Sequence, residues 1–163
     1  MMYDVLIIGA GVCGTLTARE LTRFGCSVCL VDKGPDAASG ASRANSGIVH
    51  AGFDAQNGTL KARLNVEGCQ KMPQVAHELD VEYKNTPSLV VCLSEEDRPV
   101  LNELYERGVQ NGVPNLRIVE RDELRKMEPN ISEKAVAALY APSAGIVSPY
   151  ELAIAAGENA VQK

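Results

Sequence analysis

The chain has 163 residues, of which 45% are hydrophobic and 23% are charged, and its formal net charge is −5. This composition is typical of a folded globular protein and excludes wholesale disorder. The negative charge and the absence of Trp provide neither a basic nor an aromatic surface for a nucleic acid, so we expect no nucleic-acid partner.

The chain opens with a strand–helix–strand pattern. Residues 4–8 (DVLII) form a short apolar run that stops at glycine, as a buried parallel strand does. Residues 12–24 are predicted to form a helix that ends at Gly25, and residues 26–32 (CSVCLVD) a second strand. We therefore predict an α/β fold that begins with a Rossmann-like βαβ unit and a parallel sheet.

A G-x-G-x-x-G fingerprint lies between the first strand and the helix. Gly9 permits the tight turn, Gly11 lets a pyrophosphate approach the backbone, and Gly14 allows close packing of helix and strand. The helix N-terminus supplies N–H donors for a diphosphate. Asp32 ends the second strand and can accept hydrogen bonds from the adenosine ribose, which argues against a 2′-phosphate. Lys33 beside it belongs to the same predicted site and weakens that argument.

A long Gly/Ser-rich run, residues 34–52 (GPDAASGASRANSGIVHAG), follows the second strand without a helical or strand period. One interpretation is a surface linker. The other is a backbone that wraps around the rest of a large cofactor. A nicotinamide enzyme normally continues into another β-α unit here, whereas the ribityl chain and isoalloxazine of FAD extend well past the pyrophosphate. The run therefore favours FAD over NAD.

The remaining elements follow from apolar periodicity and turn residues. Pro73 is expected to kink or restart its helix, because it cannot donate to the carbonyl of Cys69. Ser94 begins a capping-box-like SEED, and Ser148 is the expected cap of the last helix. We predict helices at 59–79, 94–110, 121–129 and from 149 on, with strands at 87–93, 116–120, 136–141 and 145–148.

The five cysteines are expected to be thiols. Cys26 and Cys29 spell C-x-x-C, but in a strand residues three apart point to opposite faces, so we expect neither a metal site nor a disulfide there. Asp4 stands where a signal peptide carries positive charge, and the apolar run after it is too short to span a bilayer. We expect a cytoplasmic protein without a transmembrane segment, with peripheral association at the inner membrane face as an alternative.

With these motifs, the chain resembles the FAD-dependent D-amino-acid-oxidase-like superfamily. Within it, the chain is most similar to the bacterial-type glycerol-3-phosphate dehydrogenase branch, with L-2-hydroxyglutarate oxidases as close relatives. The fingerprint with Asp32 and SGASRANSGIVHAGF carry the superfamily resemblance, and SLVVCLSEED, LRKMEPNI and LYAPSAGIVSPYEL indicate the branch. The resemblance covers essentially all 163 residues.

The resemblance implies a discontinuous, truncated architecture. Residues 1–80 would be the first part of the FAD-binding domain, residues 81–148 a partial mixed α+β substrate domain, and residues 149–163 a helix returning to the FAD-binding domain. The family's later strands and a C-terminal flavin contact have no counterpart in this sequence. We therefore expect an N-terminal portion that, taken alone, holds FAD weakly or not at all.

The resemblance also implies cofactor contacts in the Gly/Ser-rich run. Ser42 and Arg43 would lie along the pyrophosphate or ribityl path. Asn45, Ser46 and Gly47 would approach the flavin. For Arg43, a solvated loop charge is the alternative interpretation.

His50 would lie near the substrate side of the flavin ring, and it is the candidate base; a structural histidine is the alternative. The implied reaction oxidises a hydroxyl-bearing small substrate such as glycerol 3-phosphate by hydride transfer to the flavin, while the base takes the hydroxyl proton. L-2-hydroxyglutarate oxidation and an inactive dinucleotide-binding fragment remain as alternatives. The electron acceptor stays open between a quinone, oxygen and a partner redox protein.

Overall fold

The computed structural model describes residues 2–162, which divide into two compact units. The first unit contains the chain up to Gly47, the segment Gln74–Tyr83 and the chain from Val147 on. The second contains Ile48–Pro73 and Lys84–Ile146. The polypeptide thus leaves the first unit and returns to it twice, so each unit is assembled from segments that are distant in sequence.

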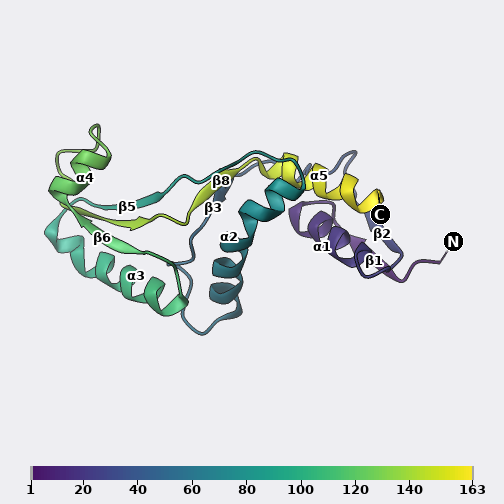
Figure 1. Cartoon of the computed structure of the whole chain (residues 1–163), viewed down its shortest axis with the longest axis horizontal. Helices are drawn as coiled ribbons and strands as arrows, with labels where there is room; N and C mark the ends of the chain where they lie inside the picture. Colours follow the sequence, from purple (N-terminus) through teal and green to yellow (C-terminus); the bar gives the residue numbers. More distant parts are fainter. Residues whose placement is uncertain (1, 163) are drawn as a thin grey trace. The chain divides into compact units, whose positions relative to one another are not determined.

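The first unit begins with the expected βαβ motif (Figure 1). Strand β1 (Val5–Ile8) leads into helix α1 (Val12–Thr22), and strand β2 (Val28–Val31) follows. The two strands pair in parallel, from Val5 opposite Val28 to Ile8 opposite Val31. The predicted α/β class and the parallel strand pair are confirmed.

The last helix, α5 (Pro149–Val161), packs along α1 within the same unit (Figure 1). Small residues permit this contact: Ala18 on α1 and Ala153 and Ala156 on α5 are buried. A Cβ atom on Gly157 would lie 3.6 Å from Thr15 Cγ2, an ordinary van der Waals contact. The helix at the end of the chain therefore covers the helix at its beginning.

A buried arginine joins three segments of the first unit. The Arg19 side chain is 3% exposed. Its guanidinium donates to the Glu78 carboxylate and, through Nε, to Asn159 Oδ1 at 3.2 Å. Glu78 ends helix α2 (Leu60–Glu78), and Asn159 lies on α5. Because a buried charge must be paired, this contact ties α1, α2 and α5 together.

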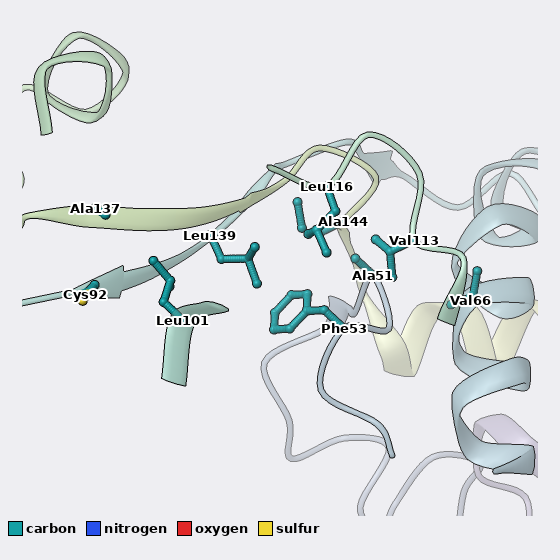
Figure 2. Packing of buried hydrophobic residues seen from close by; sticks show 11 residues of the cluster. Ala51, Phe53, Val66, Cys92, Leu101, Val113, Leu116, Ala137, Leu139 and Ala144 are labelled. Atoms are coloured by element: carbon teal, nitrogen blue, oxygen red, sulfur yellow. The ribbon is translucent and has the colours of Figure 1, made fainter. Parts of the chain in front are cut away.

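The second unit is built on an antiparallel sheet with the strand order β5-β7-β6. Its strands are β5 (Ser88–Cys92), β7 (Ala137–Ala141) and β6 (Arg117–Glu120), and helix α3 (Arg98–Asn111) packs against them. The core shown in Figure 2 lies between helix, sheet and loop. Its buried members are Ala51, Phe53, Val66, Cys92, Leu101, Val113, Leu116, Ala137, Leu139, Ala141 and Ala144.

The remaining elements are short. Strands β3 (Ile48–Val49), β8 (Gly145–Val147) and β4 (Tyr83–Lys84) form a small sheet in the order β3-β8-β4. Helix α2 continues through Pro73. The 3₁₀ turn η1 (Glu95–Asp97) precedes α3, and α4 (Arg121–Met127) follows β6. The predicted elements are present at nearly the predicted positions.

Neither of the two predicted serine caps makes the expected side-chain hydrogen bond to a helix N–H. Ser94 precedes η1, whose tight turn directs the hydroxyl to the Asp97 carboxylate at 2.9 Å and to no backbone N–H. Ser148 occupies the N-cap position of α5, but its buried hydroxyl oxygen has no hydrogen-bond partner. The Ser94 contact is local and the Ser148 hydroxyl is buried, and neither hydroxyl accepts a hydrogen bond from a helix N–H.

Candidate functional site

The glycine turn brings β1 and α1 into close contact. Gly9 has a φ of +111°, a conformation that side chains other than glycine rarely adopt. A Cβ atom on Gly14 would overlap the carbonyl oxygen of Gly9 and lie 3.4 Å from Ile7 Cγ2. Gly14 therefore lets the first turn of the helix pack directly on the strand end, as the spacing of the glycines predicts.

Ser42 lies over the N-terminus of α1. Its hydroxyl oxygen accepts a hydrogen bond from the Val12 N–H at 2.9 Å. A Cβ atom on Gly11 would lie 2.9 Å from the same oxygen. The Ala38 N–H donates to the Ala10 carbonyl at 2.9 Å, so the Gly/Ser-rich run folds back onto the fingerprint instead of leaving it as a linker.

An open groove of about 420 Å³ lies at this turn. Its walls are formed by the backbone at the N-terminus of α1, by the end of β1 and by the Ser42 hydroxyl. The first turn of α1 carries no acidic residue. Backbone N–H donors, the positive end of a helix dipole and the missing side chain at Gly11 fit a diphosphate. The lining residues are Ile8, Gly9, Gly11, Val12, Cys13, Gly14, Thr17 and Ser42.

Asp32 connects the glycine turn to the loop after β2. Its Oδ2 accepts the Ala10 N–H at 2.6 Å, and its Oδ1 accepts the Gly34 N–H at 2.7 Å. These hydrogen bonds hold the pKa of the Asp32 carboxyl below its ordinary value, and the bond from the Ala10 N–H has the largest effect. The exposed carboxylate is therefore ionised at neutral pH and can accept further hydrogen bonds. Lys33, also exposed, adds a favourable charge.

The segment after Ser42 folds on itself through Asn45. The Asn45 amide donates to the carbonyls of Ala41 and Ser42, at 3.1 Å each, and its oxygen accepts the Gly47 N–H at 2.8 Å. Gly47 has a φ of +67°. The loop is therefore ordered by its own side chain.

The structure groups most of the predicted residues in one unit. Gly9, Gly11, Gly14 and Ser42 line one groove, Asp32 supports its turn, and Lys33, Asn45 and Gly47 belong to the same unit. Arg43 and Ser46 are exposed in that unit as well. His50 belongs to the second unit, where its side chain is exposed and its carbonyl accepts the Asn65 side-chain amide at 3.1 Å.

Sequence reasoning missed two side chains of the groove, Cys13 and Thr17. They lie four residues apart on α1, and therefore on one helix face. That spacing could have identified them once the fingerprint fixed the start of the helix.

All five cysteines are free. Among residues 2–162, no group of three or more His, Cys, Asp and Glu side chains could hold a metal ion. Within the same residues, no helix has the length and apolar character needed to cross a membrane.

The βαβ motif, the glycine turn and the ionised carboxylate after β2 define a dinucleotide-binding protein of the Rossmann-like class. Its family is shown by a model of FAD dependent oxidoreductases, which matches residues 4–163. The chain belongs to this family, and FAD is its cofactor.

Two curated relatives illustrate the branch. The glycerol 3-phosphate dehydrogenase of Caloramator mitchellensis is 45% identical over 161 residues, which cover 99% of this chain and 34% of the relative. The mitochondrial L-2-hydroxyglutarate dehydrogenase of Nematostella vectensis is 35% identical over 159 residues, 96% of this chain and 34% of the relative. The chain thus spans about a third of the length of these relatives.

Solved structures show the same fold. The L-alpha-glycerophosphate oxidase of Mycoplasma pneumoniae, solved with FAD bound, has a TM-score of 0.93 at 30% identity and covers 99% of this chain and 43% of that one. Glycine oxidase of Bacillus cereus has a TM-score of 0.84 at 29% identity, with 98% and 44% covered.

Proposed function

We propose that these 163 residues are the N-terminal portion of an FAD-dependent dehydrogenase that oxidises glycerol 3-phosphate. The glycine turn with its groove supports the cofactor, and the 45% identity to a glycerol 3-phosphate dehydrogenase supports the substrate. In this proposal residues 1–80 begin the FAD-binding domain, residues 81–148 begin the substrate domain, and residues 149–163 return to the first.

In the proposed site, the residues of the first unit hold the cofactor. The N–H groups at the start of α1 bind the diphosphate beside Gly11, and the Asp32 carboxylate accepts hydrogen bonds from the ribose. Ser42 and Arg43 line the path toward the riboflavin half. Asn45, whose amide is used within the loop, acts by shaping the backbone through Gly47.

Bound FAD supplies the two-electron acceptor for the substrate C–H bond. His50 is the proposed base that takes the hydroxyl proton of the substrate. An imidazole can accept a proton near neutral pH, and the exposed side chain of His50 is accessible to a substrate.

L-2-hydroxyglutarate is the second candidate substrate. Several curated relatives that are 31–35% identical to this chain are L-2-hydroxyglutarate dehydrogenases. The higher identity to the glycerol 3-phosphate enzyme favours the first candidate. We place the protein in the cytoplasm, because five free thiols fit a reducing compartment. Peripheral association with the inner membrane face stays an alternative, and the electron acceptor stays open.

Two hybrid proteins test the substrate. In the first, this chain replaces the matching segment of the Caloramator mitchellensis enzyme, and in the second, that of the Nematostella vectensis enzyme. We expect the first hybrid to retain FAD through gel filtration and to lose its oxidised-flavin absorbance when glycerol 3-phosphate is added without oxygen. Bleaching in the second hybrid alone, by L-2-hydroxyglutarate, would overturn the assignment in favour of the second candidate.

The 163-residue chain alone provides a separate measurement, titration with FAD and with ADP. Saturable ADP binding that Gly11→Val abolishes would support the diphosphate site, because the added side chain fills the groove and displaces Ser42. Binding of neither ligand by the chain, or by the hybrids, would favour an inactive fragment.

A further inference from the structure

The segment that presents His50 has an unusual environment for a loop. Residues 50–58, called the His50 loop below, contain no helix or strand. Yet Ala51, Phe53 and Ala55 are 1%, 7% and 2% exposed. The backbone of a buried segment must satisfy its polar groups with partners from elsewhere in the protein.

The side chain of Asn111, the last residue of α3, supplies two of those partners. Its Nδ2 donates to the Gly52 carbonyl at 3.0 Å and to the Ala55 carbonyl at 2.7 Å. Its Oδ1 accepts a hydrogen bond from Asn57 Nδ2 at 2.7 Å. Both donors and the acceptor of this one amide are therefore engaged by the His50 loop, which fixes the orientation of the amide.

Packing holds the same loop from two sides. Phe53 projects from it toward Leu101 and Leu139 in the core (Figure 2). Gly108 on α3 permits this approach, because a Cβ atom there would lie 2.8 Å from Phe53 Cβ. Gly52, with a φ of +106°, packs against Val66 of α2, where a Cβ atom would meet Val66 Cγ2 at 2.6 Å.

His50 is the exposed residue at the start of this buried loop. Its carbonyl is held by Asn65 on α2, at 3.1 Å, and the backbone two residues later is held by Asn111. The backbone is thus held at the His50 carbonyl and again two residues later, so little conformational freedom of the imidazole remains beyond its own side-chain rotations. A side chain that must contact a substrate in one geometry needs a fixed backbone of this kind.

We propose that Asn111 is a positioning residue for His50. The inference rests on the proposed function, in which His50 is the base. By bonding two carbonyls of the His50 loop, Asn111 fixes the place of the imidazole without touching the substrate itself.

The test uses Asn111→Asp in the 163-residue chain. The replacement keeps the shape of the side chain but places an oxygen where Nδ2 now donates to two carbonyls. The readouts are amide hydrogen exchange of residues 51–55 and the NMR signal of the His50 imidazole. The chain has two histidines, and the second, His77, belongs to the other unit, so its signal is an internal reference.

We expect exchange in residues 51–55 to accelerate at least tenfold and the His50 signal to shift, while the His77 signal stays in place. Asn102→Asp, an exposed change on the same helix, is the matched control and leaves both readouts unaltered. Leu124→Ala weakens a separate core cluster of the second unit. It lowers the urea midpoint without moving the His50 signal. An unmoved signal in Asn111→Asp, or the same movement in Leu124→Ala, overturns the proposal.

The hybrid with the Caloramator mitchellensis enzyme separates this inference from the proposed function. There, Asn111→Asp is expected to lower kcat at least tenfold with unchanged FAD content, and His50→Asn to lower it further. A full kcat in Asn111→Asp, despite a shifted His50 signal, overturns the positioning role. A full kcat in His50→Asn overturns the base assignment. The positioning role in the reaction is then overturned as well. The order of the His50 loop is decided separately, by the NMR result alone.

Discussion

Gly14 and Gly157 both lie where helices of the first unit meet other elements, but their surroundings differ. A Cβ atom on Gly14 would overlap a backbone oxygen, which cannot move without displacing the turn. A Cβ atom on Gly157 would meet only a methyl group at ordinary contact distance. A side chain is therefore excluded at Gly14, whereas a methyl group can be accommodated at Gly157.

We expect Gly14→Ala to lower the free energy of unfolding by about 3 kcal/mol, because α1 must move off β1. It should also abolish ADP binding, since the N–H donors move with the helix. Gly157→Ala is expected to raise the free energy of unfolding by about 0.5–1 kcal/mol through helix propensity. Urea denaturation and ADP titration of both variants check these values. A Gly14→Ala protein as stable as the wild type would contradict the close helix–strand contact.

The helices of the first unit are connected through charge as well as through packing. Arg19 and Arg23, one turn apart on the chain, both pair with Glu78. The Arg19 side chain is 3% exposed and that of Arg23 is 40% exposed. The same carboxylate thus has one buried and one solvated partner, and only the buried one also reaches α5. A buried ion pair that links three elements is expected to contribute more to the free energy of unfolding than an ion pair on the surface.

Arg19→Ala is expected to lower the free energy of unfolding by about 2–3 kcal/mol, through lost charged hydrogen bonds and lost packing. The matched change Arg23→Ala should cost at most about 1 kcal/mol. Denaturant unfolding of the two variants measures the difference. Equal effects would show that the burial of Arg19 has no energetic consequence.

The same pair has a pH dependence with a defined sign. The pKa of the Glu78 carboxyl lies below its ordinary value of 4.5, chiefly because the carboxylate accepts a hydrogen bond from Arg19. The stabilisation is therefore complete above about pH 4.5 and is lost as the pH falls through the lowered pKa. The difference in stability between the wild type and Arg19→Ala should shrink below pH 4.5. A difference that stays constant down to pH 3 would contradict this coupling.

The β1–β2 pair has one open apolar face. Ile7 lies near Gly14 and faces α1. Leu6 and Ile8 point the opposite way and are 60% and 83% exposed, and Val31, the partner of Ile8, is 41% exposed. Parallel sheets are generally covered on both faces. This patch is therefore expected to bind other apolar surfaces when the chain is studied alone.

The double variant Leu6→Thr, Ile8→Thr should make the isolated chain less prone to self-association, with a loss of at most about 1 kcal/mol in stability, because both side chains are already largely exposed. Ile7→Thr, on the packed face of the same strand, is the control and should destabilise more. Light scattering after gel filtration and binding of a hydrophobic dye give the two readouts. Unchanged association in the double variant would exclude this patch as its cause.

Most of the elements and the cofactor class can be predicted from the sequence, whereas the short strands β3 and β4 cannot. Apolar runs that stop at Gly9 and Gly25, together with the spacing of Gly11, Gly14 and Asp32, are local signals, because each reflects the conformation and contacts of nearby backbone. They predicted the βαβ motif, the parallel pair and the dinucleotide turn. The family resemblance, carried by short motifs, added FAD.

The distant side chains that complete these local features are visible only in the folded chain. The buried Arg19 donates a hydrogen bond to Asn159, 140 residues away. The proposed role of Asn111 depends on the carbonyls of Gly52 and Ala55, more than 50 residues earlier. Hydrogen bonds and burial between remote segments form only when the chain folds, so no local pattern records them. The motifs therefore located the candidate site, whereas the distant side chains that hold its segments in place were found only in the structure.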